Sequence, residues 1–560
     1  MKRTRTCSQL LAASVVHVAL YLFVAAWPGQ TGRFSPLPRL MHNPLWDVTT
    51  YYVPLAHDVQ EGHWVKNASP TTYEHRDDGT AFSPLPIWLL ALLSIVVGAE
   101  WLPVACSVLF PPLALYLSFR IARALGHEEH TAWLIAWVML LSWNLHWSLG
   151  SLRRAPLDPI RGLTFLWYCR FTHPALTFPL HAWGLLSLLR ALERPTLGRR
   201  IHALVPLVLV AASDPHGALL LGLAHAAALV ARIRMEGLRA LVPDIGLYTL
   251  AAAAASPIAW MYLVNLGSAA VEQEVASTGV RSRMPKTDVL QLLPFLFLLS
   301  PRVRRTGWPA WAGLGLGILV LYNIRVFTGW EWQHWYYLWR TINPWMALFG
   351  VHLALTVAGR LAASRPWVVS WEPRACLAAC SALFAFGLAS QAAFARQYAA
   401  RFRYTDAERQ ISGWFASNHG NQAVVLCWNP DLASLILCTS DYNTLIPWFN
   451  ARSFPRHEAD LRLAWGMHAY GMRGEDRDAL LADPGYGTFY FGHVTAGAGE
   501  LATGVRPLLD AIQPADPARI PFRLDYVVED PRYPTSPAIT SRWEVVLDVQ
   551  GHRVWRLPRK

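Results

Sequence analysis

Long apolar runs separated by short polar links dominate the first 393 residues of the sequence. They cover residues 9–27, 84–98, 101–119, 131–149, 173–192, 201–212, 216–231, 244–265, 288–300, 308–325, 341–360 and 375–393. An α-helix needs about 20 apolar residues to cross a bilayer, and several of these runs are shorter. Runs 201–212 and 288–300 are therefore expected to end inside the protein, beside a cavity. The pattern predicts a polytopic α-helical membrane protein with about 11–12 membrane segments.

After residue 393 the pattern becomes that of a small soluble α/β domain. Residues 404–420 have apolar side chains at helical spacing, and residues 423–427 form a short apolar run typical of a buried strand. A second helix is expected at 431–436, and strands at 526–530, 543–547 and 553–556. The sequence thus divides into a membrane domain at 1–393, with a large first outer loop at 28–83, and a C-terminal extracytoplasmic domain at 394–560.

The basic residues gather in the short links between apolar runs. They include Lys2, Arg3 and Arg5, then Arg199 and Arg200, Arg232, Arg234 and Arg239, and Arg302, Arg304 and Arg305. This is the positive-inside pattern, so the formal charge of +12 reports topology and not a nucleic-acid partner. All of these basic links fall on the cytoplasmic side only if one early segment, such as 84–98, does not fully cross the membrane.

The first apolar run reads as a retained signal anchor with its N-terminus in the cytoplasm. That orientation puts the first loop on the far side of the membrane, where its excess of acidic residues fits. We therefore expect a multi-pass protein of the bacterial inner (cytoplasmic) membrane, with the C-terminal domain in the periplasm.

Composition excludes a disordered chain, because 53% of the residues are hydrophobic and 15% are charged. The 27 tryptophans suit a protein with two membrane interfaces. No HExxH motif, Walker-type glycine loop or Gly-x-Ser-x-Gly elbow is present, and the seven cysteines have no metal-binding spacing. Cys427 and Cys438 fall in the extracytoplasmic region, where a disulfide is permitted, and two free buried thiols are the alternative.

The strongest candidate for chemistry is Asp47, which is flanked by Trp46, Tyr51 and Tyr52 just after the first apolar run. A carboxylate among aromatic residues at a bilayer surface could deprotonate an acceptor hydroxyl where a lipid-linked substrate meets a soluble one. Tyr51 would help to bind that substrate. The alternative is that Asp47 caps an interfacial helix, and the two roles are compatible.

Other acids of the first loop have simpler interpretations. Asp58 and Glu61 are expected on the solvated face of the helix that follows Asp47. Glu74, Asp77 and Asp78 precede Phe82-Ser83-Pro84 and are expected in a solvated turn, although Asp78 could return to the site as a second acid or metal ligand.

Two later loops are basic on the side where positive charge is not expected. The first contains Arg153, Arg154, Arg161, Arg170 and His173, and the second contains His334 and Arg340 among several aromatic residues. Arginines that break the positive-inside bias need an anionic partner, and a lipid phosphate is a suitable one. A plain interfacial loop and an aromatic belt are the alternatives.

Asp214 and His216 interrupt an apolar hairpin. Ionisable groups at that depth are candidates for function, unless the hairpin loop simply reaches the interface.

Together these residues resemble a known family. Asp47 is followed by Tyr51-Tyr52, by Gly62-His63-Trp64 and by Phe82-Ser83-Pro84-Leu85-Pro86, and a long helix then ends at Arg120-Ile121-Ala122-Arg123. The pattern resembles the GT-C superfamily of polyprenyl-phosphate-dependent glycosyltransferases, which includes protein O-mannosyltransferases, aminoarabinose transferases, oligosaccharyltransferases and arabinosyltransferases. The strands near the C-terminus resemble the extracytoplasmic domain that many members have.

The resemblance implies that Asp47 is the catalytic base or shares a metal, that the basic outer loops hold the donor phosphate, and that the anomeric carbon is inverted. Several relatives have paired acids in the first loop, whereas Asp47 is flanked by Trp46 and Val48. Dependence on a divalent cation, Mg²⁺ or Mn²⁺, is therefore left open.

The sequence thus predicts transfer of a sugar from a polyprenyl-phosphate donor to a hydroxyl of a lipid, glycan or protein acceptor on the outer face of the membrane. A transporter or flippase of lipid-linked sugars would share the basic loops and broken helices, and a non-catalytic polysaccharide assembly factor would share the tethered domain.

Overall fold

The computed structural model describes residues 2–39, 48–64, 73–75, 83–142, 175–266, 279–281, 283–285, 289–328, 330–332, 341–363, 371–418, 422–448, 455–472, 474–482, 498–512 and 521–557. The chain forms two compact units. The first comprises Met1–Trp27, Pro103–Trp260 and Gly279–Gln397, and the second comprises Pro28–Leu102, Met261–Thr278 and Tyr398–Lys560.

The first unit is helical. Its long helices are α1 (Lys2–Ala26), α4 (Leu102–Ala124), α5 (Glu129–Ser142), α8 (Thr177–Glu193), α9 (Leu197–Ala211), α10 (Pro215–Glu236), α11 (Val242–Leu266), α15 (Trp308–Tyr322), α18 (Asn343–Ala363) and α19 (Trp371–Tyr398). Shorter pieces are α13 (Leu293–Leu298), α14 (Pro301–Arg305), α16 (Ile324–Thr328) and an antiparallel pair, β2 (Gly279–Arg281) with β3 (Trp330–Trp332). Each apolar run of this unit contains one of these helices, so the predicted helices are confirmed.

Five helical stretches are long and apolar enough to cross a membrane, judged among the described residues by length and composition. They are Thr4–Ala26, Ala99–Ala124, Pro215–Glu236, Val242–Met261 and Pro373–Phe402. The run expected at 288–300 contains α13, a helix of only 6 residues. This agrees with the prediction that some apolar segments stop short of a full crossing.

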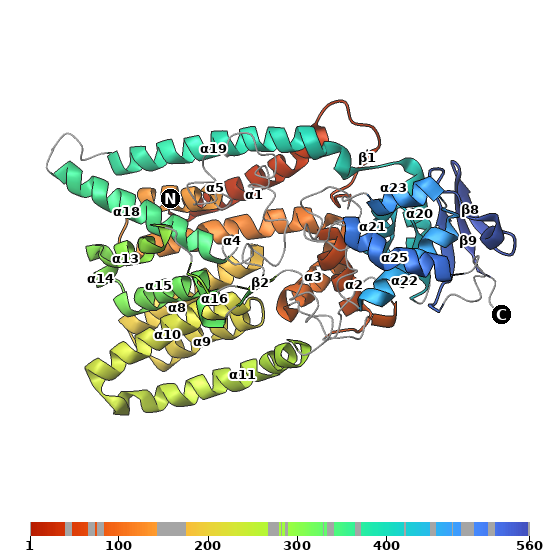
Figure 1. The fold of residues 1–560 in the computed structure, drawn as a ribbon. Coiled ribbons are helices and arrows are strands. Elements are labelled where there is room, and N and C mark those ends of the chain that lie inside the picture. Colours follow the sequence, from red (N-terminus) through yellow and green to blue (C-terminus); the bar gives the residue numbers. More distant parts are fainter. Residues whose placement is uncertain are drawn as a thin grey trace. The chain divides into compact units, whose positions relative to one another are not determined.

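Close helix contacts hold this unit together, and α8, α9, α10 and α15 lie side by side (Figure 1). Gly313 of α15 lies against the α10 backbone, because a Cβ there would be 2.2 Å from the Leu223 carbonyl oxygen. Small residues that let two backbones approach are typical of helix packing in membranes, where lipid tails are as apolar as the side chains.

The second unit is an α/β structure around a five-stranded sheet with the order β6-β5-β7-β9-β8. Its strands are β5 (Val424–Cys427), β6 (Asn443–Thr444), β7 (Tyr526–Glu529), β8 (Glu544–Val549) and β9 (His552–Arg556). Strand β5 is parallel to β6 and β7, whereas β9 is antiparallel to β7 and β8.

The helices of this unit are α20 (Asp406–Ser417), α21 (Pro430–Thr439), α22 (Arg456–Ala469), α23 (Gly474–Ala482), α25 (Ala498–Ala511) and α26 (Pro537–Thr540). Thr405 and Glu408 form a capping box at the start of α20, which explains why the helix begins there. A helical membrane part with a C-terminal α/β region, the fold class expected from the sequence, is confirmed.

Much of the first loop packs in this second unit. The loop contributes β1 (Arg33–Phe34), the π-turn η1 (Val48–Tyr52), α2 (Val53–Gln60) and α3 (Pro84–Val97), and β1 pairs with β4 (Arg403–Tyr404). The sequence had placed this loop with the membrane domain and divided the chain at 393. The difference arises because its partners lie more than 360 residues away, where no local pattern indicates them.

Candidate functional site

Most of the site residues expected from the sequence lie outside the described residues. These are Asp47, Asp78, Arg153, Arg154, Arg161, Arg170, His173, His334 and Arg340. Tyr51 belongs to η1, but the position of its side chain is not among those described. The site is therefore built here from the residues that adjoin them in the chain.

The segment directly after Asp47 is fastened to helix α21. The Thr49 carbonyl accepts hydrogen bonds from Ser434 Oγ and Cys438 Sγ, both at 3.3 Å. Eight residues later, His57 Nε2 lies 2.9 Å from the Cys438 carbonyl oxygen and donates to it. Burial lowers the pKa of His57, so the imidazole is neutral and acts as a plain donor. These bonds fix the chain that leads away from Asp47.

The segment before Asp47 is fastened by Arg39. Its guanidinium donates to Glu408 and, at 3.2 Å, to Asp431, whose carboxylates are 4% and 6% exposed. Burial lowers the pKa of Arg39 and the Asp431 and Glu408 carboxylates raise it, with a net rise, so the ion pairs stay charged. Arg39 also stacks on Tyr404, with 4.8 Å between the guanidinium carbon and the ring centroid. The chain on both sides of Asp47 is thus held by α20 and α21.

Two other acids of the loop differ from expectation. Asp58 is buried, with 8% of its surface exposed, and so it does not lie on a solvated helix face, whereas Glu61 is exposed as predicted. The reason is that α2 packs against both α3 and α21, which leaves little of its surface for water. Glu74 pairs with the fully buried Arg462 at 2.8 Å and is structural.

Cys427 and Cys438 are free thiols, so the disulfide that the sequence permitted is not formed. Cys427 Sγ, at the end of β5, donates to the Asn429 carbonyl at 3.4 Å, while Cys438 Sγ on α21 donates to Thr49. Burial raises the pKa of both thiols, which keeps them protonated and unreactive.

In the first unit, Asp214 is the centre of a buried polar cluster. It precedes α10 as its N-cap, where Oδ1 accepts from the His216 backbone N–H at 3.0 Å. Thr341 Oγ1 donates to Oδ2 at 3.1 Å, and His181 Nε2 lies 3.2 Å from the same oxygen. The contact to His181 is not aligned as a hydrogen bond.

The cluster joins the first turns of three helices. Asp214 begins α10, His181 lies in the second turn of α8, and Thr341 begins the π-turn that leads into α18. Phe178 and Trp345, in the first turns of α8 and α18, are also in contact, with ring centroids 5.7 Å apart. The partial positive charge at helix N-termini favours an ionised carboxylate at this point.

His216 is the member of the cluster that reaches the surface. Its side chain is 27% exposed, and Nδ1 lies 3.6 Å from Asp214 Oδ1. A carboxylate beside one ring nitrogen orients the imidazole. Asp214 directly precedes α10, which is long and apolar enough, by length and composition, to cross a membrane.

Sequence reasoning identified Asp214 and His216 but missed His181 and Thr341. His181 stands inside the apolar run 173–192, and an ionisable residue in a membrane segment was a usable signal. Thr341 gave no signal, because a threonine next to an apolar run is common.

Gly217 is required for this arrangement, because a Cβ there would lie 1.7 Å from His181 Nε2. We expect Gly217→Ala to push His181 away from Asp214 and to destabilise the protein by about 1–3 kcal/mol, as overpacking does. The measurement is the melting temperature of the purified full chain in detergent.

Gly222→Ala is the matched control, because it lies on the same helix and a Cβ there meets nothing within 4 Å. It should leave the melting temperature unchanged or raise it slightly, since alanine favours helix. Equal melting temperatures for the two variants would contradict the close contact between Gly217 and His181.

The described residues contain no group of three or more His, Cys, Asp or Glu side chains that could hold a metal ion. The acids that the sequence named as metal ligands, Asp47 and Asp78, are outside that part of the chain.

The fold and the cluster define a multi-span helical membrane protein with an extramembrane α/β region and a buried polar cluster at a helix junction. No family model matches the chain. No curated protein matches it either. Solved structures do show similarity of fold.

Two of these are oligosaccharyltransferases from Archaeoglobus fulgidus. One, AglB in complex with an inhibitory peptide and a dolichol-phosphate, is 13% identical, with coverage of 94% of this chain and 70% of that chain and a TM-score of 0.42. The other, in complex with Zn and sulfate, is 13% identical, with coverage of 92% and 68% and a TM-score of 0.43.

The third is ArnT from Cupriavidus metallidurans bound to undecaprenyl phosphate, at 13% identity, coverage of 97% of this chain and 96% of that chain, and a TM-score of 0.37.

Proposed function

We propose that this protein is a membrane glycosyltransferase that moves a sugar from a polyprenyl-phosphate donor to a hydroxyl of a lipid, glycan or protein acceptor. The reaction would take place on the periplasmic face of a bacterial inner membrane. Asp47 would be the base, and arginines 153, 154, 161, 170 and 340, with His173 and His334, would bind the donor phosphate.

One observation of the first unit carries this proposal. The two loops rich in arginine and aromatic residues lead directly into α8 and α18, and the first turns of those helices meet at Asp214. His173 is two residues before the described start at Ala175, and Arg340 is next to Thr341. Chain connectivity therefore limits how far these two side chains can lie from the Asp214 cluster. This supports a shared anion-binding role for two loops that are 160 residues apart in the sequence.

The chemistry follows from the groups available. Asp47 takes the proton of the acceptor hydroxyl, whose oxygen attacks the anomeric carbon of the donor. The bond from that carbon to the phosphate oxygen breaks, and the polyprenyl phosphate leaves with the electron pair. Attack opposite the leaving group inverts the anomeric configuration. Arginine side chains neutralise the departing phosphate through charge-assisted hydrogen bonds, which are strongest where water is excluded.

The partly exposed His216 side chain, which lies beside Asp214, would contribute to this site by binding and not by proton transfer. Its loss should therefore weaken donor affinity more than turnover.

The test is a transfer assay in membranes with a panel of radiolabelled polyprenyl-phosphate sugars. We expect label to appear in an acceptor with release of one polyprenyl phosphate for each sugar transferred, and no transfer in membranes that lack the protein. Movement of intact labelled lipid across the membrane without release of polyprenyl phosphate would instead identify a transporter and overturn the proposal.

A further inference from the structure

A second polar site lies at the opposite end of α8 from the Asp214 cluster. A groove between α8 and α9 is lined by Ser187, Arg190, Gly198, Arg199 and His202. Arg190 is 13 residues after Thr177, which is about 20 Å along the helix. The groove borders one of the basic links, so the positive-inside pattern places it at the cytoplasmic surface.

The groove carries unbalanced positive charge. Arg120 and Arg199 both lie close enough to the Arg190 guanidinium for their like charges to repel it, while one carboxylate, that of Glu193 on the same helix, attracts it. The positive charges therefore outnumber the negative charge around Arg190. Arg199 Nη1 is held at 3.2 Å from the Arg190 carbonyl oxygen, and Arg120 Nη1 at 2.7 Å from Tyr116 Oη. An anion would relieve the repulsion.

Two neutral groups in the groove also fit an anion. The Ser187 side chain is buried, with 1% of the residue exposed, and its hydroxyl has no hydrogen-bond partner in the described structure. Other membrane-helix hydroxyls here bond back to their own helix, as Ser107 does to the Pro103 carbonyl. His202 Nε2 accepts from Trp183 Nε1 at 3.1 Å, so the ring proton is on Nδ1, which is left as a donor.

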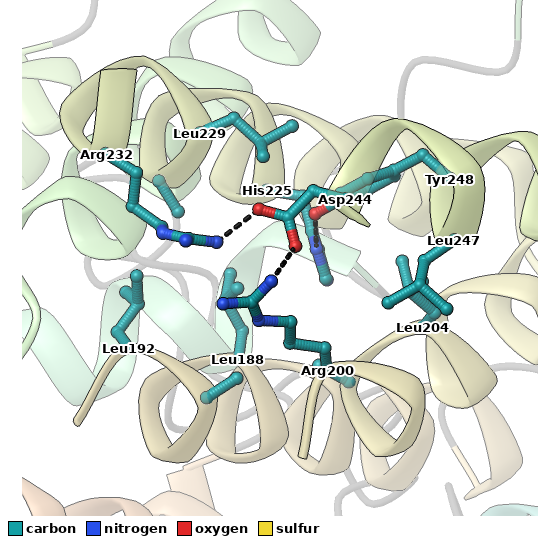
Figure 2. A pocket seen from close by; sticks show the side chains of 13 residues that line it. Leu188, Leu192, Arg200, Leu204, His225, Leu229, Arg232, Asp244, Leu247 and Tyr248 are labelled. Atoms are coloured by element: carbon teal, nitrogen blue, oxygen red, sulfur yellow. Dashed lines mark hydrogen bonds and ion pairs between the residues drawn. The ribbon is translucent and has the colours of Figure 1, made fainter. Parts of the chain in front are cut away.

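The neighbouring pocket provides an internal contrast (Figure 2). There Arg200 and Arg232 both donate to Asp244, Arg200 at 3.0 Å, and Arg232 also donates to Glu236 at 3.0 Å. Two arginines meet two carboxylates, so that pocket needs no external anion. The groove beside it is lined by two arginines, Arg190 and Arg199, and by no carboxylate.

The surface next to the groove indicates where the anion comes from. Leu197, Ile201 and Val205 of α9 are 62%, 45% and 42% exposed and, at a spacing of four residues, form one apolar stripe. The stripe begins at the turn of α9 that contributes Gly198 and Arg199. A phosphate joined to an acyl chain could pair with the arginines of the groove while its acyl chain packs along the apolar stripe.

We propose that this groove binds the phosphate of an anionic phospholipid, with the headgroup against Arg190, Arg199 and Ser187 and an acyl chain along the α9 stripe. The site lies at the cytoplasmic side and takes no part in the transfer reaction, so it stands independently of the proposed function. Its role is to hold the α8–α9 end of the bundle in a membrane that contains anionic lipid.

The experiment is native mass spectrometry of the delipidated full chain, titrated with phosphatidylglycerol, phosphatidylcholine or inorganic phosphate. We expect phosphatidylglycerol to bind more tightly than phosphatidylcholine. The double variant R190Q/R199Q should lower the affinity for phosphatidylglycerol about 30-fold, which corresponds to about 1 kcal/mol for each arginine removed. Ser187→Ala, which keeps every charge, should weaken it about threefold or more through the lost hydrogen bond.

The matched control is R194Q/R234Q, which removes the same charge from two exposed arginines of this surface. It should bind phosphatidylglycerol as the wild type does. Equal affinity in the wild type, R190Q/R199Q and the control would overturn the site. Binding of inorganic phosphate that depends on Arg190 and Arg199, with no preference for phosphatidylglycerol, would overturn the lipid assignment and identify a soluble phosphate as the ligand.

Discussion

Replacing Asp47 with asparagine is expected to abolish sugar transfer while the protein still inserts in the membrane. Loss of a general base typically lowers turnover 100-fold to 10,000-fold, on the order of 3–5 kcal/mol in the barrier. Asparagine is as good a helix N-cap as aspartate, so the substitution removes the base but preserves the cap. The readout is the initial rate of transfer, with the amount of membrane-inserted protein measured in parallel.

This choice of substitution separates the two interpretations of Asp47. If the residue only caps a helix, Asp47→Asn should transfer sugar at the wild-type rate. The control is Asp406→Asn, which changes an exposed acid in the first turn of α20, in the same unit. That variant should remain active, and loss of activity in both would mean that the assay reports folding and not the base.

The second large effect is expected from Arg39→Met. It leaves the buried carboxylates of Glu408 and Asp431 without their shared cation, and breaking a buried ion pair in this way typically costs about 3–5 kcal/mol. Glu408 also accepts from the Thr405 backbone N–H, so its displacement would weaken the start of α20 as well. We expect a clear fall in the melting temperature of the purified protein and faster proteolysis of the first loop.

Arg33→Met is the control for this variant. Arg33 also pairs with an acid of α20, Asp406 at 2.7 Å, but the two side chains are 74% and 51% exposed. Exposed pairs contribute about 1 kcal/mol or less, so Arg33→Met should change stability little. Equal losses for Arg33→Met and Arg39→Met would show that Arg39 is not a buried anchor.

The helices and strands were predictable because their signals are local. Apolar runs predicted the membrane helices, and the strand at 423–427 and the helix after it were visible in the same way. Asp214 was found because a charge between two apolar runs is conspicuous. These features depend on residues within one element of each other.

The anchoring of the first loop was not predictable from local patterns. Asp58 looked like a solvated residue because nothing near it in the sequence shows that α21 covers α2. Arg39 looked like one more base in a polar loop, although its partner Asp431 is 392 residues away. Contacts of that separation leave no periodic trace in a single sequence.

The distance along the chain between Arg39 and Asp431 also sets a minimum time before the first loop can be anchored during synthesis. At a synthesis rate of about 5–20 residues per second, the ribosome needs roughly 20–80 s to make the 392 residues that separate the two side chains. Throughout that interval the loop that contains Asp47 has no α21 to fasten it. The newly made membrane helices are therefore present before the loop is anchored, and the C-terminal part of the second unit, which is made last, supplies the anchor.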